Sequence, residues 1–225
     1  MTNTRNDLRQ GTLWKQILFF SLPIAATSML QQLFNSADVA VVGRFSAQKD
    51  LALAAVGSTS SVVNLFITII TGLAVGANVV IARSIGASDE KRARQAVHTA
   101  LILSLLCGAI LLVLGECIAL PLLEIMDTPS DIIGLAGKYL RIYMLGVFFQ
   151  TIYNFEASIL RANGDTRRPL FCLIFSGAVN VVLNLVFVIG FQLDVAGVAI
   201  ATVLADVVGA GMLFHYLRRE TGPVR

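Results

Sequence analysis

Six long runs of apolar residues, separated by short polar segments, divide the sequence. A helix that crosses a bilayer needs about 20 residues, and each run is long enough. The pattern predicts six membrane-spanning helices, at Ile17–Val42, Leu51–Ala82, Ala96–Leu114, Tyr139–Leu160, Leu170–Phe191 and Val195–Leu217. The apolar stretch at 116–126 is too short for a seventh span and contains Pro121, so we expect an interfacial loop or a short half-helix there.

Composition extends this picture to the whole chain. Of the 225 residues, 56% are hydrophobic and only 14% are charged, with a mean hydropathy of +0.77. A soluble domain carries roughly 25% charged residues. The deficit covers the full length, which indicates an all-α membrane protein rather than a soluble domain with one anchor. The loops hold no phosphate-binding loop and no catalytic cluster. We therefore expect no enzyme activity, no cofactor and no nucleic-acid partner.

The basic residues predict how the helices are oriented. Thirteen of the 17 fall in alternate polar segments: the N-terminal tail, the second loop, the fourth loop and the C-terminal tail. Basic residues favour the cytoplasmic side of a membrane. We therefore expect a multi-pass protein of the cell inner or plasma membrane, with both termini in the cytoplasm. The other side keeps Arg44, Lys49, Lys138 and Arg141.

Polar residues inside the predicted spans carry the candidate chemistry. An ionisable residue at membrane depth costs at least about 2.5–3.5 kcal/mol, so it is a functional hypothesis by default. Asp38 shares one helix face with Gln31 and Asn35, at spacings of three and four residues. Three other spans each carry a polar pair four residues apart: Gln150 and Asn154, Asn180 and Asn184, Thr202 and Asp206. We expect these four stripes to meet inside the bundle.

Two interpretations of the stripes compete. Amides between membrane helices often serve only as glue, worth about 0.6 kcal/mol each. A carboxyl group is a poor choice for glue, so Asp38 favours a site that responds to protons or sodium ions. We interpret Glu156 as an ion-pair partner of Arg161 near the cytoplasmic face. Asp206 belongs either to the site or to a cytoplasmic vestibule. Pro23 is either a hinge or a static kink.

Several segments together resemble one transporter family. They are SLPIAATSMLQQLFNSADVAVVGRF, LAAVG, GLAVGANVVIARSIGASDEKRARQAV, ILRANGDTRRP, NVVLNLVFVIG and GVAIATVLAD. In this order, over about residues 10–217, they are similar to the N-terminal half of the multidrug and toxic compound extrusion (MATE) transporters. The resemblance implies a six-helix bundle that is one lobe of a twelve-helix transporter. It implies a cytoplasmic tail at 1–15, a transmembrane lobe at 16–217 and the start of an inter-lobe linker at 218–225.

The resemblance also implies a function and a set of site residues. The function is export of cationic amphipathic drugs by antiport with protons or sodium ions. The implied partners are the lipid bilayer, small cationic organic substrates, and a missing C-terminal lobe or a second copy. By this match, Asp38, Asn180 and Thr202 couple transport to the ion and are the candidate Na⁺ ligands, and Gln31 and Asn154 line the substrate cavity. Beside the match, we expect Asn184 to join the coupling residues, Asn35 to line the cavity with the rest of its stripe, and Pro23 to act as the hinge.

One departure from the family pattern concerns the acids. Some members carry a second Asp on the fifth helix, where this chain has Asn184. Two alternatives to a drug antiporter remain. A lipid-linked oligosaccharide flippase of the same superfamily would need a cationic cavity for pyrophosphate, and no Lys or Arg lies deep in the spans. A non-transporting membrane scaffold would tolerate Leu in place of Asp38.

Overall fold

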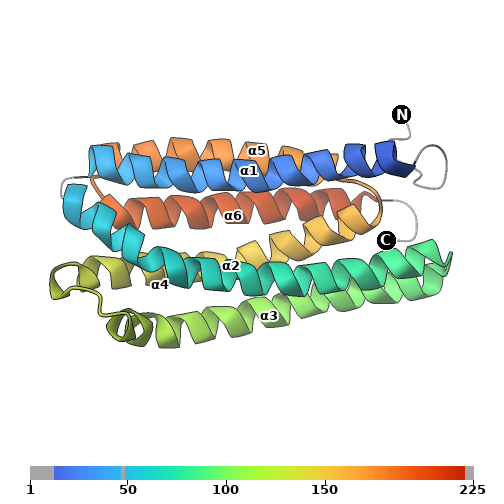
Figure 1. The fold of residues 1–225 in the computed structure, drawn as a ribbon, viewed down its shortest axis with the longest axis horizontal. Coiled ribbons are helices and arrows are strands. Elements are labelled where there is room, and N and C mark those ends of the chain that lie inside the picture. The colour runs from blue at the N-terminus through green and yellow to red at the C-terminus, as the bar shows by residue number, and fades with distance from the viewer. Residues whose placement is uncertain (1–12, 47–48, 221–225) are drawn as a thin grey trace.

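The computed structural model describes residues 13–46 and 49–220, which form a bundle of long helices (Figure 1). These are α1 (Leu13–Phe45), α2 (Lys49–Gly86), α3 (Glu90–Ile125), α4 (Ser130–Ala162), α5 (Arg167–Leu185) and α6 (Asp194–Arg218), with a short π-helix, η1 (Val186–Gly190), continuing α5. Within the described residues, six helices are long and apolar enough to cross a membrane, which confirms the six predicted spans. Residues 1–12 of the predicted tail and 221–225 of the predicted linker lie outside the described part.

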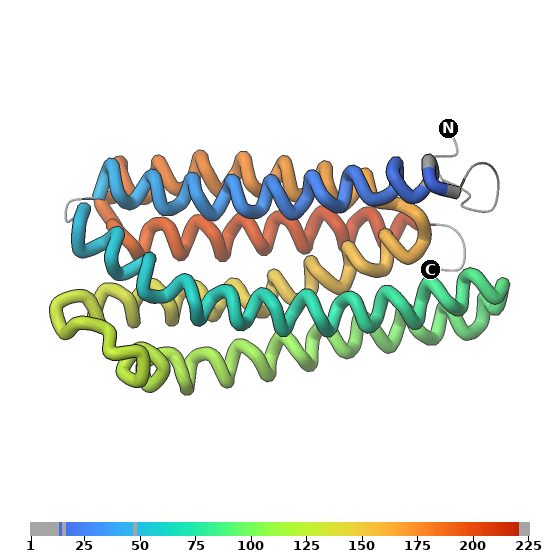
Figure 2. The backbone as a smooth tube through the Cα atoms, in the orientation of Figure 1, coloured from blue at the N-terminus to red at the C-terminus, as the bar shows by residue number. Residues whose placement is uncertain are grey.

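Helix α4 is the centre of the bundle. It packs against α2, α3 and α6, whereas α1 packs chiefly against α5. In Figure 1, α1 and α5 form one edge of the molecule, α6 lies beside them, and α2, α4 and α3 form the other side. The tube in Figure 2 shows the start of α1, the α2–α3 turn, the α4–α5 turn and the end of α6 at the same end of the bundle.

Local sequence explains the two sharp turns at this end. Before α3, the Asp89 carboxylate caps the helix by accepting a hydrogen bond from the Arg92 amide at 3.0 Å. Between α4 and α5, Gly164 adopts a φ of 86°, which a residue without a Cβ reaches without strain. Asp165 follows and accepts hydrogen bonds from the amides of Arg167 and Arg168, both at 3.1 Å. The Gly-Asp step therefore ends one helix and begins the next.

The expectation of a loop or half-helix at 116–126 is wrong. Helix α3 continues through Pro121 and ends at Ile125. The buried face of α3 explains why, because Leu111, Gly115, Ala119 and Leu123 recur every four residues and pack toward α4. A methyl group at Gly115 would overlap the side chain of Met144 on α4. This packing outweighs the backbone hydrogen bond that Pro121 removes.

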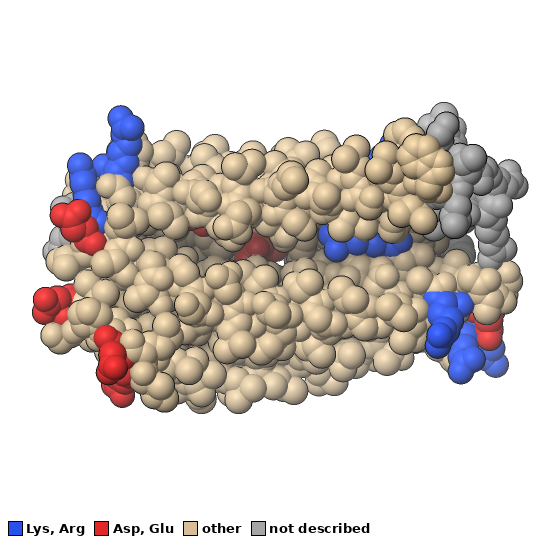
Figure 3. Space-filling model, viewed as in Figure 1, with Lys and Arg blue, Asp and Glu red and all other residues tan. Residues whose placement is uncertain are grey.

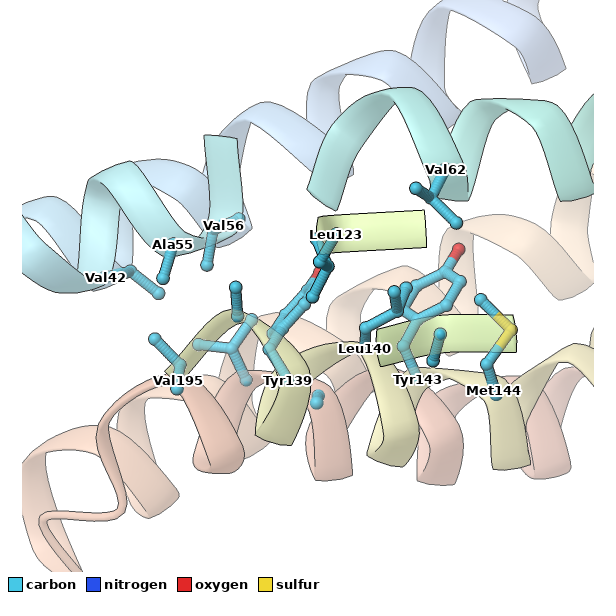
Figure 4. Close-up of a cluster of buried hydrophobic side chains, with 14 of the residues drawn as sticks. Val42, Ala55, Val56, Val62, Leu123, Tyr139, Leu140, Tyr143, Met144 and Val195 are labelled. Carbon is cyan, nitrogen blue, oxygen red and sulfur yellow. The ribbon is translucent and has the colours of Figure 1, made fainter. Parts of the chain in front are cut away.

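Two hydrophobic clusters form the core of the described residues. One joins α2, α3, α4 and α5 to the end of α6, and the other lies between α2, α3 and α4 and continues to the start of α6. Figure 4 shows part of it, with Val56 and Val62 of α2 facing Tyr139, Leu140 and Tyr143 of α4. The rings of Tyr139 and Tyr143 stack with their centres 6.0 Å apart. Many large apolar side chains elsewhere are exposed, among them Trp14, Phe19, Met29 and Leu33 on α1. Such a surface suits a lipid environment.

Candidate functional site

A polar hollow lies between the layer of α1, α5 and α6 and the layer of α2 and α4. It consists of two adjoining pockets of about 210 and 330 Å³, and Asp38 lines both. In the space-filling view, most charged side chains gather near the two ends of the molecule, whereas the groove between the layers shows acidic surface midway along it and basic surface farther toward the end of the α2–α3 turn (Figure 3). Among the described residues, no Lys or Arg lines either pocket. The hollow therefore favours cations over anions.

Asp38 is the hub of a hydrogen-bond network across three helices. Its carboxyl group is only 7% exposed. Asn184 Nδ2 on α5 donates to Asp38 Oδ1 at 2.6 Å, and Thr202 Oγ1 on α6 lies 3.3 Å from Asp38 Oδ2. Asn184 Nδ2 also donates to Asn180 Oδ1 at 3.1 Å, and Asn180 Nδ2 donates to Thr202 Oγ1 at 3.3 Å. The network ties α1 to α5 and α6.

In two members of the network, the hydrogen-bond donors and acceptors do not match in number. The Thr202 hydroxyl lies 3.3 Å from Asp38 and 3.0 Å from the Val198 carbonyl, but it has one proton to donate. Asn184 Oδ1 is fully buried and accepts no hydrogen bond within the described structure. A buried acceptor without a donor is costly, by about 1–3 kcal/mol. The network could therefore rearrange with little loss if the charge on Asp38 changed.

The donor set can be tested against a sodium ion. Asp38, Asn180 and Thr202 offer carboxylate, amide and hydroxyl oxygens, which suit a hard cation. In the present arrangement, however, Asn184 Nδ2 points at both Asp38 and Asn180. A turn of the Asn184 amide would replace these donors by its unpartnered oxygen. After the Asn184 amide turns, the site presents only oxygen atoms and fits Na⁺. Without that turn, the site fits a proton on Asp38.

The structure also places the residues expected to line the substrate cavity. Gln31, Asn35 and Asn154 all line the pocket that contains Asp38, and Asn35 lines the second pocket as well. Asn154 Nδ2 donates to the Gln150 carbonyl at 2.8 Å. Pro23 does not line either pocket, and α1 is continuous through it. The four polar stripes thus meet, and the predicted hinge lies apart from them.

Sequence reasoning missed part of the lining. Asn64 and Thr71 of α2, seven residues apart, lie on one face and line the pocket, as does Tyr143 of α4. Their spacings were a usable signal, because residues seven apart share a helix face. Asp206, which the sequence left between two locations, lines the same pocket as Asp38. The cavity therefore holds a second carboxyl group after all, on α6 instead of α5.

The predicted ion pair between Glu156 and Arg161 is wrong. Glu156 is fully buried, and neither of its carboxyl oxygens has a hydrogen-bond partner within the described residues. The two residues are five positions apart, which turns them about 140° from each other around a helix. Glu156 also lies outside both polar pockets. Its burial needs another explanation.

Comparisons with known proteins agree on a family. The sequence model of the MatE family matches residues 23–186. The chain is 33% identical over 214 residues to the probable multidrug resistance protein YpnP of Bacillus subtilis, covering 93% of the chain and 46% of YpnP. It is 29% identical over 221 residues to the probable multidrug resistance protein YoeA of the same organism, covering 95% of the chain and 47% of YoeA.

A solved structure supports the same assignment. The crystal structure of a MATE protein in its bent conformation superposes with a TM-score of 0.89 at 30% identity. The match covers 98% of this chain and 49% of that protein. The chain thus spans about half the length of the relatives it matches.

Proposed function

The chain belongs to the MatE family of transporters, and from that membership we propose that it is the N-terminal lobe of a secondary antiporter for cationic amphipathic drugs. Protons or sodium ions are the proposed coupling ions. The observation that carries the proposal is the contact of Asp38 with Asn184 and Thr202 at the wall of a polar hollow. The chain is a multi-pass membrane protein, and its proposed location is the cell inner or plasma membrane.

The charge of the hollow supports a cationic substrate. Asp38 and Asp206 both line it, together with amide and hydroxyl groups, and no described Lys or Arg does so. A cavity for a pyrophosphate-linked sugar would need basic groups for the phosphates. The hollow therefore disfavours the flippase alternative. Gln31, Asn35 and Asn154 are proposed to orient the substrate by hydrogen bonds.

The coupling step is proposed to act on the attachment of α1. When Asp38 is an anion, it accepts hydrogen bonds from Asn184 on α5 and from Thr202 on α6. A proton on Asp38 removes one acceptor, and the Thr202 hydroxyl can then turn fully to the Val198 carbonyl. A sodium ion would act through the turned Asn184 amide. Protonation weakens the link between α1 and its neighbours, whereas a sodium ion would tie Asp38 to oxygens of α5 and α6, so the two states differ in the wall of the hollow.

Pro23 is the proposed hinge of this movement. Proline has no N–H, so the carbonyl of Phe19, four residues earlier, lacks its usual partner. The Thr27 hydroxyl donates to a different carbonyl, that of Pro23, at 2.8 Å, and a contact of this kind often bends a helix. Pro23 lies 15 residues before Asp38, which is about 22 Å along a helix. A bend there would swing the segment that carries Asp38 while the start of α1 stays in place.

We propose that both termini face the cytoplasm. Lys91, Arg92 and Arg94 lie at the start of α3, directly after the α2–α3 turn, and Arg167 and Arg168 begin α5 after the α4–α5 turn. Both turns lie at the end of the bundle where α1 begins and α6 ends (Figure 2). Basic residues collected at one end favour the cytoplasmic side. The Asp38 network then lies toward the outer half of the membrane.

The test is Asp38→Asn in the protein expressed from its complete reading frame. Asn keeps the shape of the side chain but can neither take up a proton nor hold a charge near neutral pH. We expect dye efflux from everted vesicles to fall by at least about tenfold, the equivalent of one charge-assisted hydrogen bond. Asp131→Asn, an exposed acid at the start of α4, is the matched control. Dye efflux is measured under a proton gradient alone and under a sodium gradient alone, and the gradient that drives efflux identifies the coupling ion.

Two outcomes would overturn the proposal. Unchanged, gradient-dependent efflux in Asp38→Asn would remove Asp38 from the coupling step. Absence of gradient-driven efflux from the parent, together with an unchanged phenotype in Asp38→Leu, would favour the scaffold alternative, because a scaffold transports nothing and does not need the carboxyl group.

A further inference from the structure

A second acid is buried in the bundle without a partner. Glu156 on α4 is fully buried, and both of its carboxyl oxygens lack a hydrogen-bond donor among the described residues. The nearest basic residue along α4, Arg161, forms no ion pair with it within the described structure. A buried acid left in this state costs several kcal/mol unless something pairs with it. The acid is therefore either neutralised by a proton or paired with a group from outside the described residues.

Glu156 lines an apolar pocket between α3, α4 and α6. The pocket has a volume of about 440 Å³, within the range of about 300–1,000 Å³ that holds small ligands. Its walls include Leu105 of α3, Phe149 and Ile152 of α4, and Val207 and Phe214 of α6. The lining also holds one hydroxyl, that of Ser104, which already donates to the Leu101 carbonyl at 2.7 Å. The Glu156 carboxyl group is the other polar group at its wall, and because both of its oxygens are buried, a ligand reaches it only when the Glu156 side chain turns toward the pocket.

This pocket is separate from the polar hollow that contains Asp38. On α4, Gln150 and Asn154 face the hollow, whereas Phe149, Ile152 and Glu156 face the pocket. At 100° per residue, the two sets lie about 140° apart around the helix. On α6, Thr202 and Asp206 are turned away from Val207 and Phe214 by about 110° on average. Both helices therefore stand between the two sites.

The mouth of the pocket lies on apolar surface. Leu105, Val207 and Phe214 are all exposed. Gly211 is also exposed, and a Cβ built there would meet no atom within 4 Å. Because the six helices are membrane spans, this surface is reached from the lipid phase. Glu156 lies six residues before the end of α4, about 9 Å from the end that we propose to be cytoplasmic.

We propose that this pocket is a lateral binding site for a lipophilic ammonium compound. An N–H group on the cation would donate to Glu156, and the apolar body of the compound would fill the space between α3, α4 and α6. A lipid acyl chain would fill the space but leave the acid unpaired. A metal ion is disfavoured, since no group of three His, Cys, Asp or Glu side chains occurs among the described residues. The site is distinct from the proposed transport site and does not depend on it.

Dansylcadaverine is a suitable probe, because it joins an apolar fluorophore to a primary ammonium group. Its matched control is the dansyl amide of pentylamine, which lacks the terminal amine. Both are titrated by fluorescence against the purified protein, made from its complete reading frame, in lipid nanodiscs. Three variants are compared: Glu156→Gln, Glu116→Gln as the control acid on α3, and Gly211→Phe, which fills the mouth of the pocket. The Asp38→Asn background removes a contribution from the other site.

In that background, we expect Glu156→Gln to weaken dansylcadaverine binding by about tenfold or more and leave the neutral analogue unchanged. Glu116→Gln should bind as the parent does, and Gly211→Phe should weaken both probes. Equal binding of the two probes to the parent would overturn the proposal, because the acid would then contribute nothing. Unchanged binding in both Glu156→Gln and Gly211→Phe would overturn it too, because the probe would lie elsewhere. If Asp38→Asn by itself abolished dansylcadaverine binding, the probe would bind at the transport site, and this result would also refute a separate lateral site.

Discussion

Gly177 on α5 controls how closely α1 can approach, and its replacement by Ala is the sharpest test of the proposed coupling. A Cβ at this position would overlap the ring of Phe34 on α1. Phe34 lies one turn before Asp38, on the same face of α1. The added methyl group must therefore displace the ring, and we expect the strain to loosen the segment of α1 that brings Asp38 to within 2.6 Å of Asn184.

The size of the effect follows from the cost of overpacking. An extra methyl group in a packed interface typically costs about 1–3 kcal/mol. If that cost falls on the state in which α1 is docked against α5, undocking becomes about 5- to 150-fold more frequent. Amide hydrogen exchange in α1 depends on such local opening. We therefore expect exchange across residues 31–45 to accelerate within this range, and dye efflux to lose its dependence on the ion gradient.

Hydrogen–deuterium exchange with mass spectrometry in nanodiscs measures the opening. Gly76→Ala on α2 is the matched control, because a Cβ there meets no atom within 4 Å and the same substitution only improves helix propensity. Phe34→Leu removes the ring atoms that clash, so the double variant should recover slow exchange. Exchange in α1 that is equal in Gly177→Ala and in the parent would refute the idea that α5 holds α1 in place.

Three further predictions concern single contacts. Thr202→Val removes the hydroxyl beside Asp38 and should lower dye efflux by about tenfold, whereas Thr202→Ser should keep it; equal efflux in both would exclude this contact. Asp206→Asn should weaken binding of a dicationic dye more than of a monocationic one in fluorescence titrations, because it removes one of two acids in the hollow. Asp89→Ala removes the cap of α3 and should lower the free energy of unfolding by about 0.5–2 kcal/mol in detergent, with efflux unchanged; a change in efflux at full stability would contradict a purely structural role.

Helix count and helix faces could be predicted from the sequence because both depend on local spacing. The six apolar runs correspond to the six helices. The polar stripes, for example Gln31 and Asp38 on α1 or Asn180 and Asn184 on α5, do point into one hollow. Residues three and four apart share a helix face whatever the rest of the chain does. Even the turn at Gly164 and Asp165 could be recognised as a break from its residues.

The predictions that were wrong or incomplete all depend on which residues of other helices contact a side chain. Pro121 should end a helix by local rules, yet packing of α3 on α4 carries the helix past it. Arg161 is the nearest cation to Glu156 in the sequence, but the helix turns the two apart and leaves the acid facing α3 and α6. Asp206 could be placed on a polar stripe but not in a particular cavity.

The sequence alone determined the six spans, their polar faces and the unusual position of Asp38, because hydrophobicity and helical periodicity are properties of neighbouring residues. Only the tertiary structure decided that Asp38 on α1 meets Asn184 and Thr202, which are 146 and 164 residues away along the chain. It also decided that Glu156 opens onto a pocket of its own. Contacts between distant helices depend on how whole faces pack together, and no local spacing encodes which face meets which.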